Sequence, residues 1–251
     1  MLPIGICTSD SAPLAGVDFI EENVQTYLQP ETPGHVVPRR ALPVPVANAF
    51  LPAALPCVGP AVDQTRLLRY ATAAFQRAQQ AGIEIIVFGS GGSRRIPDGF
   101  PRARAEEQFL ALLRELGPLA AQARLTVVIE PLNRAECNFI HSVPEADALA
   151  AACACPQIAV LADVYHMLRD DQPPDDLRRH GARLRHVHVA EKENRTPPGV
   201  AGDDFRPFFR ALRESHYRGR IAIEAGKWTD WPAQAAVACQ QLRQQLAASG
   251  W

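Results

Sequence analysis

Four short apolar runs in the second half of the chain each end in an acidic residue or a histidine. The runs are Thr126–Glu130, Ile158–Asp163, Arg185–His188 and Arg220–Glu224. Short, nearly continuous apolar runs are typical of parallel strands that are buried on both faces. The ends of the runs lie 33, 25 and 36 residues apart, enough for one strand and one helix with their turns. The spacing therefore predicts a parallel sheet of repeated β/α units, with the four polar residues at one edge.

The rest of the chain continues this alternation. Further strands are expected at Pro3–Thr8, Val17–Val24, Leu42–Phe50 and Ile83–Phe88. Helices are expected at Asp63–Gly82, Ala103–Arg124, Val143–Cys153, Asp175–Arg183, Phe205–His216 and Trp231–Ala248. Apolar residues recur at helical spacing in the longer of these segments, and Gly82 supplies a C-cap. Eight strands with intervening helices predict an α/β protein, a (β/α)8 TIM barrel that forms one domain over residues 1–251.

Two segments depart from a regular repeat. Only about ten residues separate the first two strands, whereas a crossover between parallel strands usually takes a dozen or more. We therefore expect a truncated or missing first crossover helix, unless the first strand is wrongly placed. The proline-rich stretch Gln29–Pro60 is interpreted as long loops on the active face of the barrel. The pair Gly117-Pro118 is expected to kink the helix at Ala103–Arg124.

Charge and composition argue against several classes of function. Lys and Arg number 26 and Asp and Glu 27, so a net charge of -1 provides no broad basic surface for nucleic acid. The N-terminus lacks a basic segment before an apolar stretch, and no run approaches the roughly 18 apolar residues of a membrane helix. Six cysteines without a Cys-x-x-Cys pair indicate reduced thiols. We expect a cytoplasmic protein with no nucleic-acid or membrane partner.

Glu130, Asp163, His188 and Glu224 together indicate a metal site. Any one of them alone is commonly a helix cap, a surface acid or a core histidine. Because parallel strands end at one mouth of a barrel, all four are expected to converge, and unpaired carboxylates buried there are costly. The set suits one divalent cation, Mn²⁺ first, with Co²⁺, Mg²⁺ or Zn²⁺ as alternatives. His186 lies on the same side of its strand and is expected deeper in the barrel, so His188 is the better ligand.

Such a site favours chemistry on a sugar. Adjacent carbonyl and hydroxyl oxygens would take the open metal positions, and the metal would polarise the carbonyl and stabilise an enediolate. Glu130 and Glu224 come from strands on either side of the metal, so they can place one carboxylate on each face of the substrate. These two residues are the candidate catalytic groups, one to remove a proton and the other to return it.

Longer motifs surround the four residues. They are Glu130-Pro-Leu-Asn-Arg-Ala-Glu136, Asp163-Val-Tyr-His166-Met, His188-Val-Ala-Glu-Lys-Glu-Asn-Arg195 with a following Pro-Pro-Gly, and Ile223-Glu224. These motifs resemble those of the ketose 3-epimerases of the xylose-isomerase-like TIM barrel superfamily. Weaker similarity to that family occurs in Phe19-Ile-Glu21, Ala47-Asn-Ala-Phe50 and Phe88-Gly-Ser-Gly-Gly92. The resemblance implies a small-molecule sugar substrate and, by analogy, a homodimer or homotetramer.

The resemblance also implies roles for individual residues. It assigns the metal to the four strand-end residues and the acid/base roles to the two glutamates among them. It further implies that Glu136, His166 and Arg195 contact the hydroxyls or carbonyl of the sugar. Alternatives remain for these three: Glu136 could cap its loop, His166 could hold Asp163, and Arg195 could pair with a nearby glutamate. The spacing from His188 to Arg195 differs by one residue from that of the epimerases.

A glycine-rich segment, Phe88-Gly-Ser-Gly-Gly-Ser-Arg-Arg95, closes the fourth strand. Its loop residues Gly89, Ser90, Gly91 and Gly92 can offer backbone N–H groups to an anion, with positive charge from the arginines that follow. The segment matches neither the P-loop nor the dinucleotide pattern. A tight turn that lets the chain pass close to the substrate is therefore an equal alternative.

The sequence thus predicts a metal-dependent epimerase or isomerase that acts on a ketose-type sugar through a cis-enediolate. The alternative is an aldose/ketose isomerase or a dehydratase of the inosose or dehydroshikimate type, because these reactions begin with the same C–H abstraction. An abasic-site endonuclease-like barrel is disfavoured by only seven histidines and the lack of a basic surface bias. A non-catalytic sugar-binding barrel is disfavoured because it has little use for two metal-facing glutamates.

Overall fold

Eight parallel strands close into a barrel in the computed structural model, which describes residues 1–10, 12–226 and 228–251. The strands are β1 Ile4–Cys7, β2 Phe19–Asn23, β3 Val46–Asn48, β4 Ile85–Phe88, β5 Thr126–Ile129, β6 Ile158–Asp163, β7 Leu184–Val189 and β8 Arg220–Ile223. Each strand pairs with the next one along the chain, and β8 pairs with β1, where Ile221 lies opposite Ile4. The prediction of a (β/α)8 TIM barrel is confirmed.

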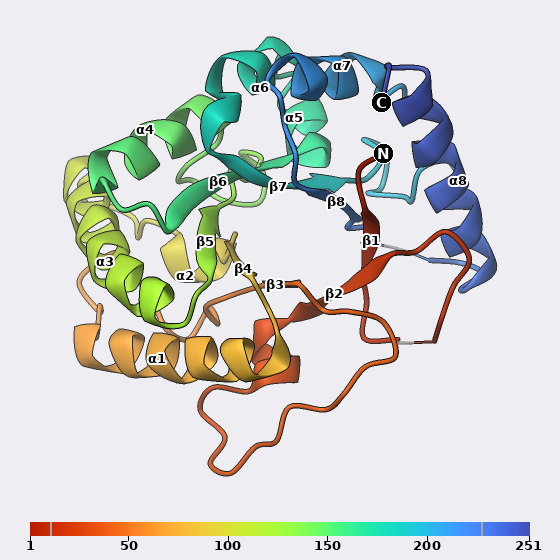
Figure 1. Cartoon of the computed structure of the whole chain (residues 1–251). Coiled ribbons are helices and arrows are strands. Elements are labelled where there is room, and N and C mark those ends of the chain that lie inside the picture. The colour runs from red at the N-terminus through yellow and green to blue at the C-terminus, as the bar shows by residue number, and fades with distance from the viewer. Residues whose placement is uncertain (11, 227) are drawn as a thin grey trace.

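Helices cover most of the outside of the barrel (Figure 1). The helices of the described residues are α1 Gln64–Ala81, α2 Gly91–Arg94, α3 Arg102–Gln122, α4 Val143–Cys153, α5 Val164–Arg169, α6 Asp175–His180, α7 Arg206–Glu214 and α8 Ala233–Ala247. Polar side chains cap several of them: Asp63 accepts the Arg66 amide at the start of α1. Within the ranges that the structure describes, no helix is both long and apolar enough to cross a membrane.

Side chains alternate between the barrel interior and the helix layer along each strand. The interior apolar cluster consists of Phe19, Val46, Ile85, Val87, Val128, Ala159, Leu161 and Ala222. Residues next to these in sequence, such as Ile129 and Val160, belong to the larger core between strands and helices. Glu130, Asp163 and Glu224 each lie two residues after one of these interior residues, namely Val128, Leu161 and Ala222. The alternation therefore directs all three carboxylates into the C-terminal mouth of the barrel.

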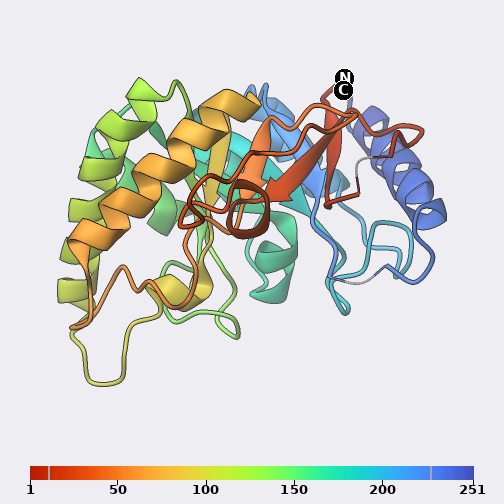
Figure 2. The ribbon, with the colours of Figure 1, turned by 90° about the horizontal axis from the view of Figure 1, so that it is seen from below.

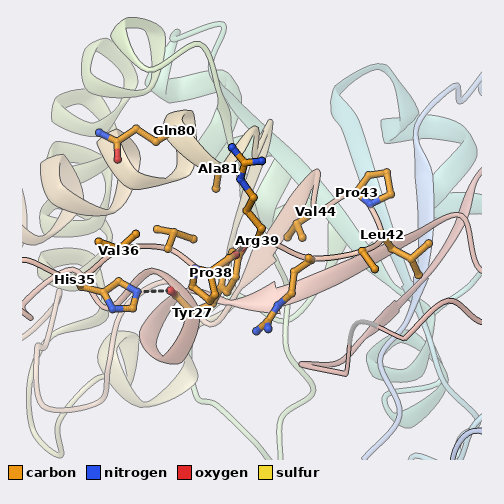
Figure 3. Close-up of a pocket in the computed structure, with 13 residues that line it drawn as sticks. Tyr27, His35, Val36, Pro38, Arg39, Leu42, Pro43, Val44, Gln80 and Ala81 are labelled. Atoms are coloured by element: carbon orange, nitrogen blue, oxygen red, sulfur yellow. Dashed lines mark hydrogen bonds between the residues drawn. The ribbon is translucent and has the colours of Figure 1, made fainter.

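The first two crossovers lack a full helix. No helix occurs among the described residues between β1 and β2, so the truncated or missing first crossover helix is confirmed. After β2 the chain forms only η1, a five-residue π-helix at Val24–Leu28, before the loop to β3. The expected strand Leu42–Phe50 is too long, because only Val46–Asn48 pairs with β2. On this flank the loop, Tyr27 and the end of α1 enclose a cavity of about 590 Å³ (Figure 3).

Helix α5 has no counterpart in the sequence prediction. It begins directly after β6, where the Asp163 side chain accepts the Tyr165 amide at 2.8 Å. Six residues are too few for helical periodicity to be visible in the sequence. The expected helix Asp175–Arg183 is instead α6 followed by a 3₁₀ turn, η2, at Gly181–Arg183. Helix α3 runs as one element through Pro118.

The two chain ends lie close together, next to the first crossover (Figures 1 and 2). β1 joins β8 through strand pairing, and α8 leads from β8 toward the C-terminus. Arg243 of α8 donates to Asp18 Oδ2 at 2.9 Å and to the backbone carbonyl of Gly16 at 2.8 Å. Helix α8 therefore contacts the β1–β2 connection, which has no helix of its own in the part that the structure describes.

Candidate active site and metal centre

The four predicted metal ligands converge at the C-terminal mouth of the barrel. Asp163 ends β6, His188 lies in β7, and Glu130 and Glu224 directly follow β5 and β8. One ligand atom from each residue lies within 4.8 Å of those of the other three, so the group can hold one metal ion. Glu130, Asp163 and His188 are buried, and Glu224 is partly buried. The structure thus brings together the residues that the strand ends indicated.

Charge and chemistry of this group fit a divalent cation. Three carboxylates share the mouth with one imidazole and with Arg195, whose guanidinium contacts Glu224 and lies 3.2 Å from Asp163 Oδ2. Burial raises the pKa of Glu130, and the charges of Glu224 and Asp163 raise it further. A cation among the four ligand atoms would relieve this repulsion, and an oxygen-rich set with one imidazole suits Mn²⁺, Co²⁺, Mg²⁺ or Zn²⁺.

Glu21, at the interior face of β2, orients the metal-facing histidine. His188 Nε2 lies 2.8 Å from Glu21 Oε1, and His186 Nε2 lies 2.7 Å from the other carboxylate oxygen. His188 therefore directs Nδ1 to the ligand group, 3.2 Å from Glu130 Oε1. Burial opposes ionisation of Glu21, but the charges and hydrogen bonds of both histidines outweigh it and lower its pKa to about 2. A carboxylate behind a ligating histidine fixes its ring orientation and raises its basicity.

The two candidate catalytic glutamates have opposite pKa shifts. The pKa of Glu130 is raised, chiefly by burial. Burial also opposes ionisation of Glu224, but the positive charges of His188 and Arg195 outweigh it and lower the pKa of Glu224. Titratable pairs whose pKa values are pushed apart are typical of acid/base sites.

Arg195 lies against the carboxylates of the mouth. Its guanidinium contacts Glu224, and Nη1 lies 3.7 Å from Glu136 Oε2. The guanidinium carbon is 4.6 Å from the centre of the Tyr165 ring, a cation–π distance that fixes its plane. Glu191, an alternative partner in the sequence, instead accepts backbone N–H groups of its own loop. Arg195 and Glu136 are thus neighbours at the site despite their separation in the sequence.

His166 has a ring nitrogen beside Asp163 that lacks a hydrogen-bond partner among the described residues. Its Nδ1 accepts the backbone N–H of Asn133 at 3.3 Å, so Nε2 carries the proton. That Nε2 lies 3.4 Å from Asp163 Oδ2 and makes no hydrogen bond to any described residue. Because His166 is buried, this N–H group requires a partner. An oxygen of a bound substrate can provide one.

Asn133 connects two candidate substrate-binding residues and was not singled out in the sequence. Its Nδ2 donates to Glu136 Oε1 at 3.0 Å and to His166 Nδ1 at 2.8 Å. Its Oδ1 accepts the amides of Ala135 and Glu136, both at 3.1 Å. The side chain is buried, so these bonds are shielded from water. Asn133 therefore holds Glu136 of its own loop and His166 of α5 in fixed positions relative to each other.

Close packing accounts for the glycines after β4. A Cβ atom at Gly89 would lie 2.0 Å from Glu130 Oε2. Cβ atoms at Gly91 and Gly92 would lie 2.9 Å and 2.7 Å from neighbouring side-chain atoms. Arg94 is buried, and its guanidinium donates to the backbone carbonyl of Glu130 at 2.6 Å. These contacts favour the tight-turn interpretation over an anion site, because the loop allows the chain to approach a catalytic carboxylate.

The fold and the site together define a class of protein. A closed parallel barrel carries a candidate metal centre at its C-terminal mouth, where TIM barrel enzymes have their active sites. The chain belongs to the xylose isomerase-like TIM barrel family, which matches residues 15–245.

Known epimerases are among its relatives. The 3-dehydro-D-guloside 4-epimerase of Escherichia coli K12 is 32% identical over 124 residues, which are 49% of this chain and 47% of that protein. The D-psicose 3-epimerase of Enterocloster bolteae is 30% identical over 124 residues, 49% of this chain and 40% of that protein. Each match thus spans less than half of the relative. An L-ribulose 3-epimerase structure shares the fold, with a TM-score of 0.84 at 19% identity over 99% of this chain and 96% of the other.

Proposed function

We propose that this protein is a divalent-metal-dependent epimerase or isomerase that moves a proton on a ketose-type sugar through a cis-enediolate. One observation carries the proposal: Glu130 and Glu224 come from different strands, β5 and β8, and belong to a single candidate metal group at the C-terminal mouth of the barrel. The sugar epimerases among the relatives support the substrate class.

The two glutamates divide the proton transfer between them. Glu224, with its lowered pKa, stays ionised and accepts a proton from a carbon next to the carbonyl group. Glu130 returns a proton to that carbon from the other side, so that one proton leaves the substrate and one enters it. Because the two side chains come from β5 and β8, they approach a substrate from different sides. The reverse reaction uses the same groups with their roles exchanged.

The site also holds the metal ion and orients the sugar. The metal would be held by Glu130, Asp163, His188 and Glu224, with Mn²⁺ as the first candidate and Co²⁺, Mg²⁺ and Zn²⁺ as alternatives. When bound, the ion supplies Lewis-acid stabilisation of negative charge on neighbouring carbonyl and hydroxyl oxygens. Glu136, His166 and Arg195 hold the remaining oxygens of the sugar, the His166 Nε2–H group as a donor.

The surroundings of the site favour an unphosphorylated sugar. Arg94 and Arg95 of the glycine-rich segment donate to the backbone carbonyls of Glu130 and Glu136, both at 2.6 Å, and so are already engaged. If residues Gly89–Gly92 instead bind a phosphate, phosphorylated ketoses will have the higher kcat/KM.

Incubation of the Mn²⁺-loaded protein with a panel of ketoses in D2O tests the proposal. An epimerase or isomerase incorporates deuterium at the exchanging carbon, which NMR detects, whereas a dehydratase gives a product lighter by one water. Each ketose is offered with and without a phosphate ester, so that the same experiment measures whether the protein prefers the phosphorylated or the unphosphorylated sugar. If no sugar exchanges deuterium or turns over although metal is bound, the proposal is wrong.

A further inference from the structure

The N-terminal end of the barrel, opposite the metal ligands, contains a second cavity. Its volume is about 630 Å³, and it is lined by the first residues of β4, β5, β7 and β8 and by the turns before them. β4 and β8 lie on opposite sides of the closed barrel, so the cavity spans the bottom of the barrel. Arg220 in the cavity and Glu224 at the mouth are about 13 Å apart along β8 at ~3.3 Å per residue.

The charge of this cavity differs from that of the whole chain. Arg124, Arg185, Arg218 and Arg220 line it, with Glu84 as its one acidic residue. Arg220 forms an ion pair with Glu84 at 2.7 Å. The whole chain, in contrast, has a net charge of -1. The cavity therefore concentrates positive charge in a protein that has no general excess of it.

The remaining three arginines have no carboxylate partner within the described ranges of the chain. Arg185 donates to the backbone carbonyls of Ala182 and Leu184 at 3.0 and 2.9 Å. Arg218 donates to the backbone carbonyl of Tyr217 at 3.1 Å. Arginines elsewhere are commonly paired with acids, for example Arg66 with Glu31, Arg183 with Asp147 and Arg206 with Asp204. Several guanidinium groups around one space, with a single acid, favour a multivalent anion.

We propose that this cavity binds an anion with two or more negative charges, such as a polyphosphate or a phosphate ester. Guanidinium groups donate in a planar fork that matches phosphate oxygens, and they keep their charge at any physiological pH. The volume lies within the usual range of small-ligand pockets. The four arginines come from three separate parts of the fold: the α3–β5 turn, the start of β7, and the turn and strand at β8. An anion would therefore bridge elements across the bottom of the barrel.

Isothermal titration with inorganic pyrophosphate tests this site. The variant R124Q/R218Q removes two exposed arginines of the cavity that have no acidic partner among the described residues. The matched control R39Q/R210Q makes the same charge change at two exposed arginines outside the cavity. Every protein is titrated as isolated and after treatment with EDTA followed by dialysis, because pyrophosphate also binds metal ions.

We expect the wild type and R39Q/R210Q to bind pyrophosphate with similar affinity before and after EDTA treatment. Binding to R124Q/R218Q should be at least about tenfold weaker, and wild-type binding should weaken as salt is added. Binding that disappears after EDTA treatment would assign the anion to a metal and overturn the proposal. Equal binding by both variants, or none by the wild type, would also overturn it. None of these outcomes depends on the sugar activity.

Discussion

His188 couples metal binding to pH. Burial opposes protonation of His188, but the charges of Glu21 and Glu224 outweigh it and raise the pKa of His188 well above its ordinary value. A ligating histidine must lose its proton, so metal affinity should rise as the pH increases above 6.5, the ordinary pKa of histidine, with proton release on binding. Titration calorimetry in buffers of different ionisation enthalpy measures this release. The variant E21Q should move the dependence to lower pH; an unchanged profile would contradict the role of Glu21.

Asn133 provides a second test at the level of single residues. N133A removes the hydrogen bonds that join Glu136 and His166, so we expect KM for the sugar to rise by about tenfold, the effect of ~1.4 kcal/mol. Metal affinity should be unchanged, because Asn133 contacts none of the four ligands. N138A is the matched control: Asn138 lies in the same loop as Asn133, and its side chain hydrogen-bonds to the backbone of Ile96 instead of to Glu136 or His166. If metal affinity falls as much as kcat/KM, the positioning role is wrong.

Strand-end residues were predictable from the sequence, whereas their supporting partners were not. Glu130 and Asp163 each end an apolar run, and parallel strands bring such ends to one mouth. Glu21 meets His186 across the barrel interior, 165 residues away in the chain. Asn133, in the loop after β5, meets His166 of α5. Side-chain contacts between non-adjacent elements depend on barrel closure and loop conformation, which periodicity does not encode.

The turn after β4 is the element that restricts Glu130 most closely. G89A should displace the Glu130 carboxylate, because a Cβ atom there would lie 2.0 Å from Glu130 Oε2. We expect metal affinity and deuterium exchange to fall by at least about tenfold, that is, by ~1.4 kcal/mol or more. G34A is the control: Gly34 has a positive φ but open space around it, so its substitution strains only the backbone. Normal metal binding by G89A would contradict this account.

Regular elements were predictable, and irregular connections were not. The helices α1, α3 and α4 follow apolar periodicity, and their boundaries agree closely with expectation. The loop between η1 and β3 carries no such period, so the extent of β3 was overestimated. The glycine loop illustrates the same limit. Its conformation depends on the position of Glu130 and not on local propensity alone.

At the scale of the whole molecule, a bound metal should stabilise the barrel, because its ligands come from β5 to β8. With free Mn²⁺ at 100 times Kd, linkage predicts about 2.7 kcal/mol of added stability. For a chain of this size that corresponds to a rise in Tm of about 5–11 °C. Scanning calorimetry with and without Mn²⁺ measures the shift, and H188Q should lose most of it. No shift in the wild type would argue against metal binding.

The eight strands expected from the sequence predicted a closed barrel, because eight β/α units are what this architecture requires. The organisation of the chain as one domain over residues 1–251, a homodimer or homotetramer, and a cytoplasmic location stay predictions. Light scattering of the purified protein measures the oligomer directly.

Glu130 and Glu224 are proposed to exchange a substrate proton at a metal centre. The most direct test of this exchange is deuterium incorporation into a turned-over ketose in D2O by wild type, E130Q and E224Q, each at saturating Mn²⁺ with bound metal quantified. We predict a loss of exchange of about 10²-fold or more in both variants, the usual contribution of a general acid or base. Exchange at the wild-type rate in both metal-loaded variants would contradict the account.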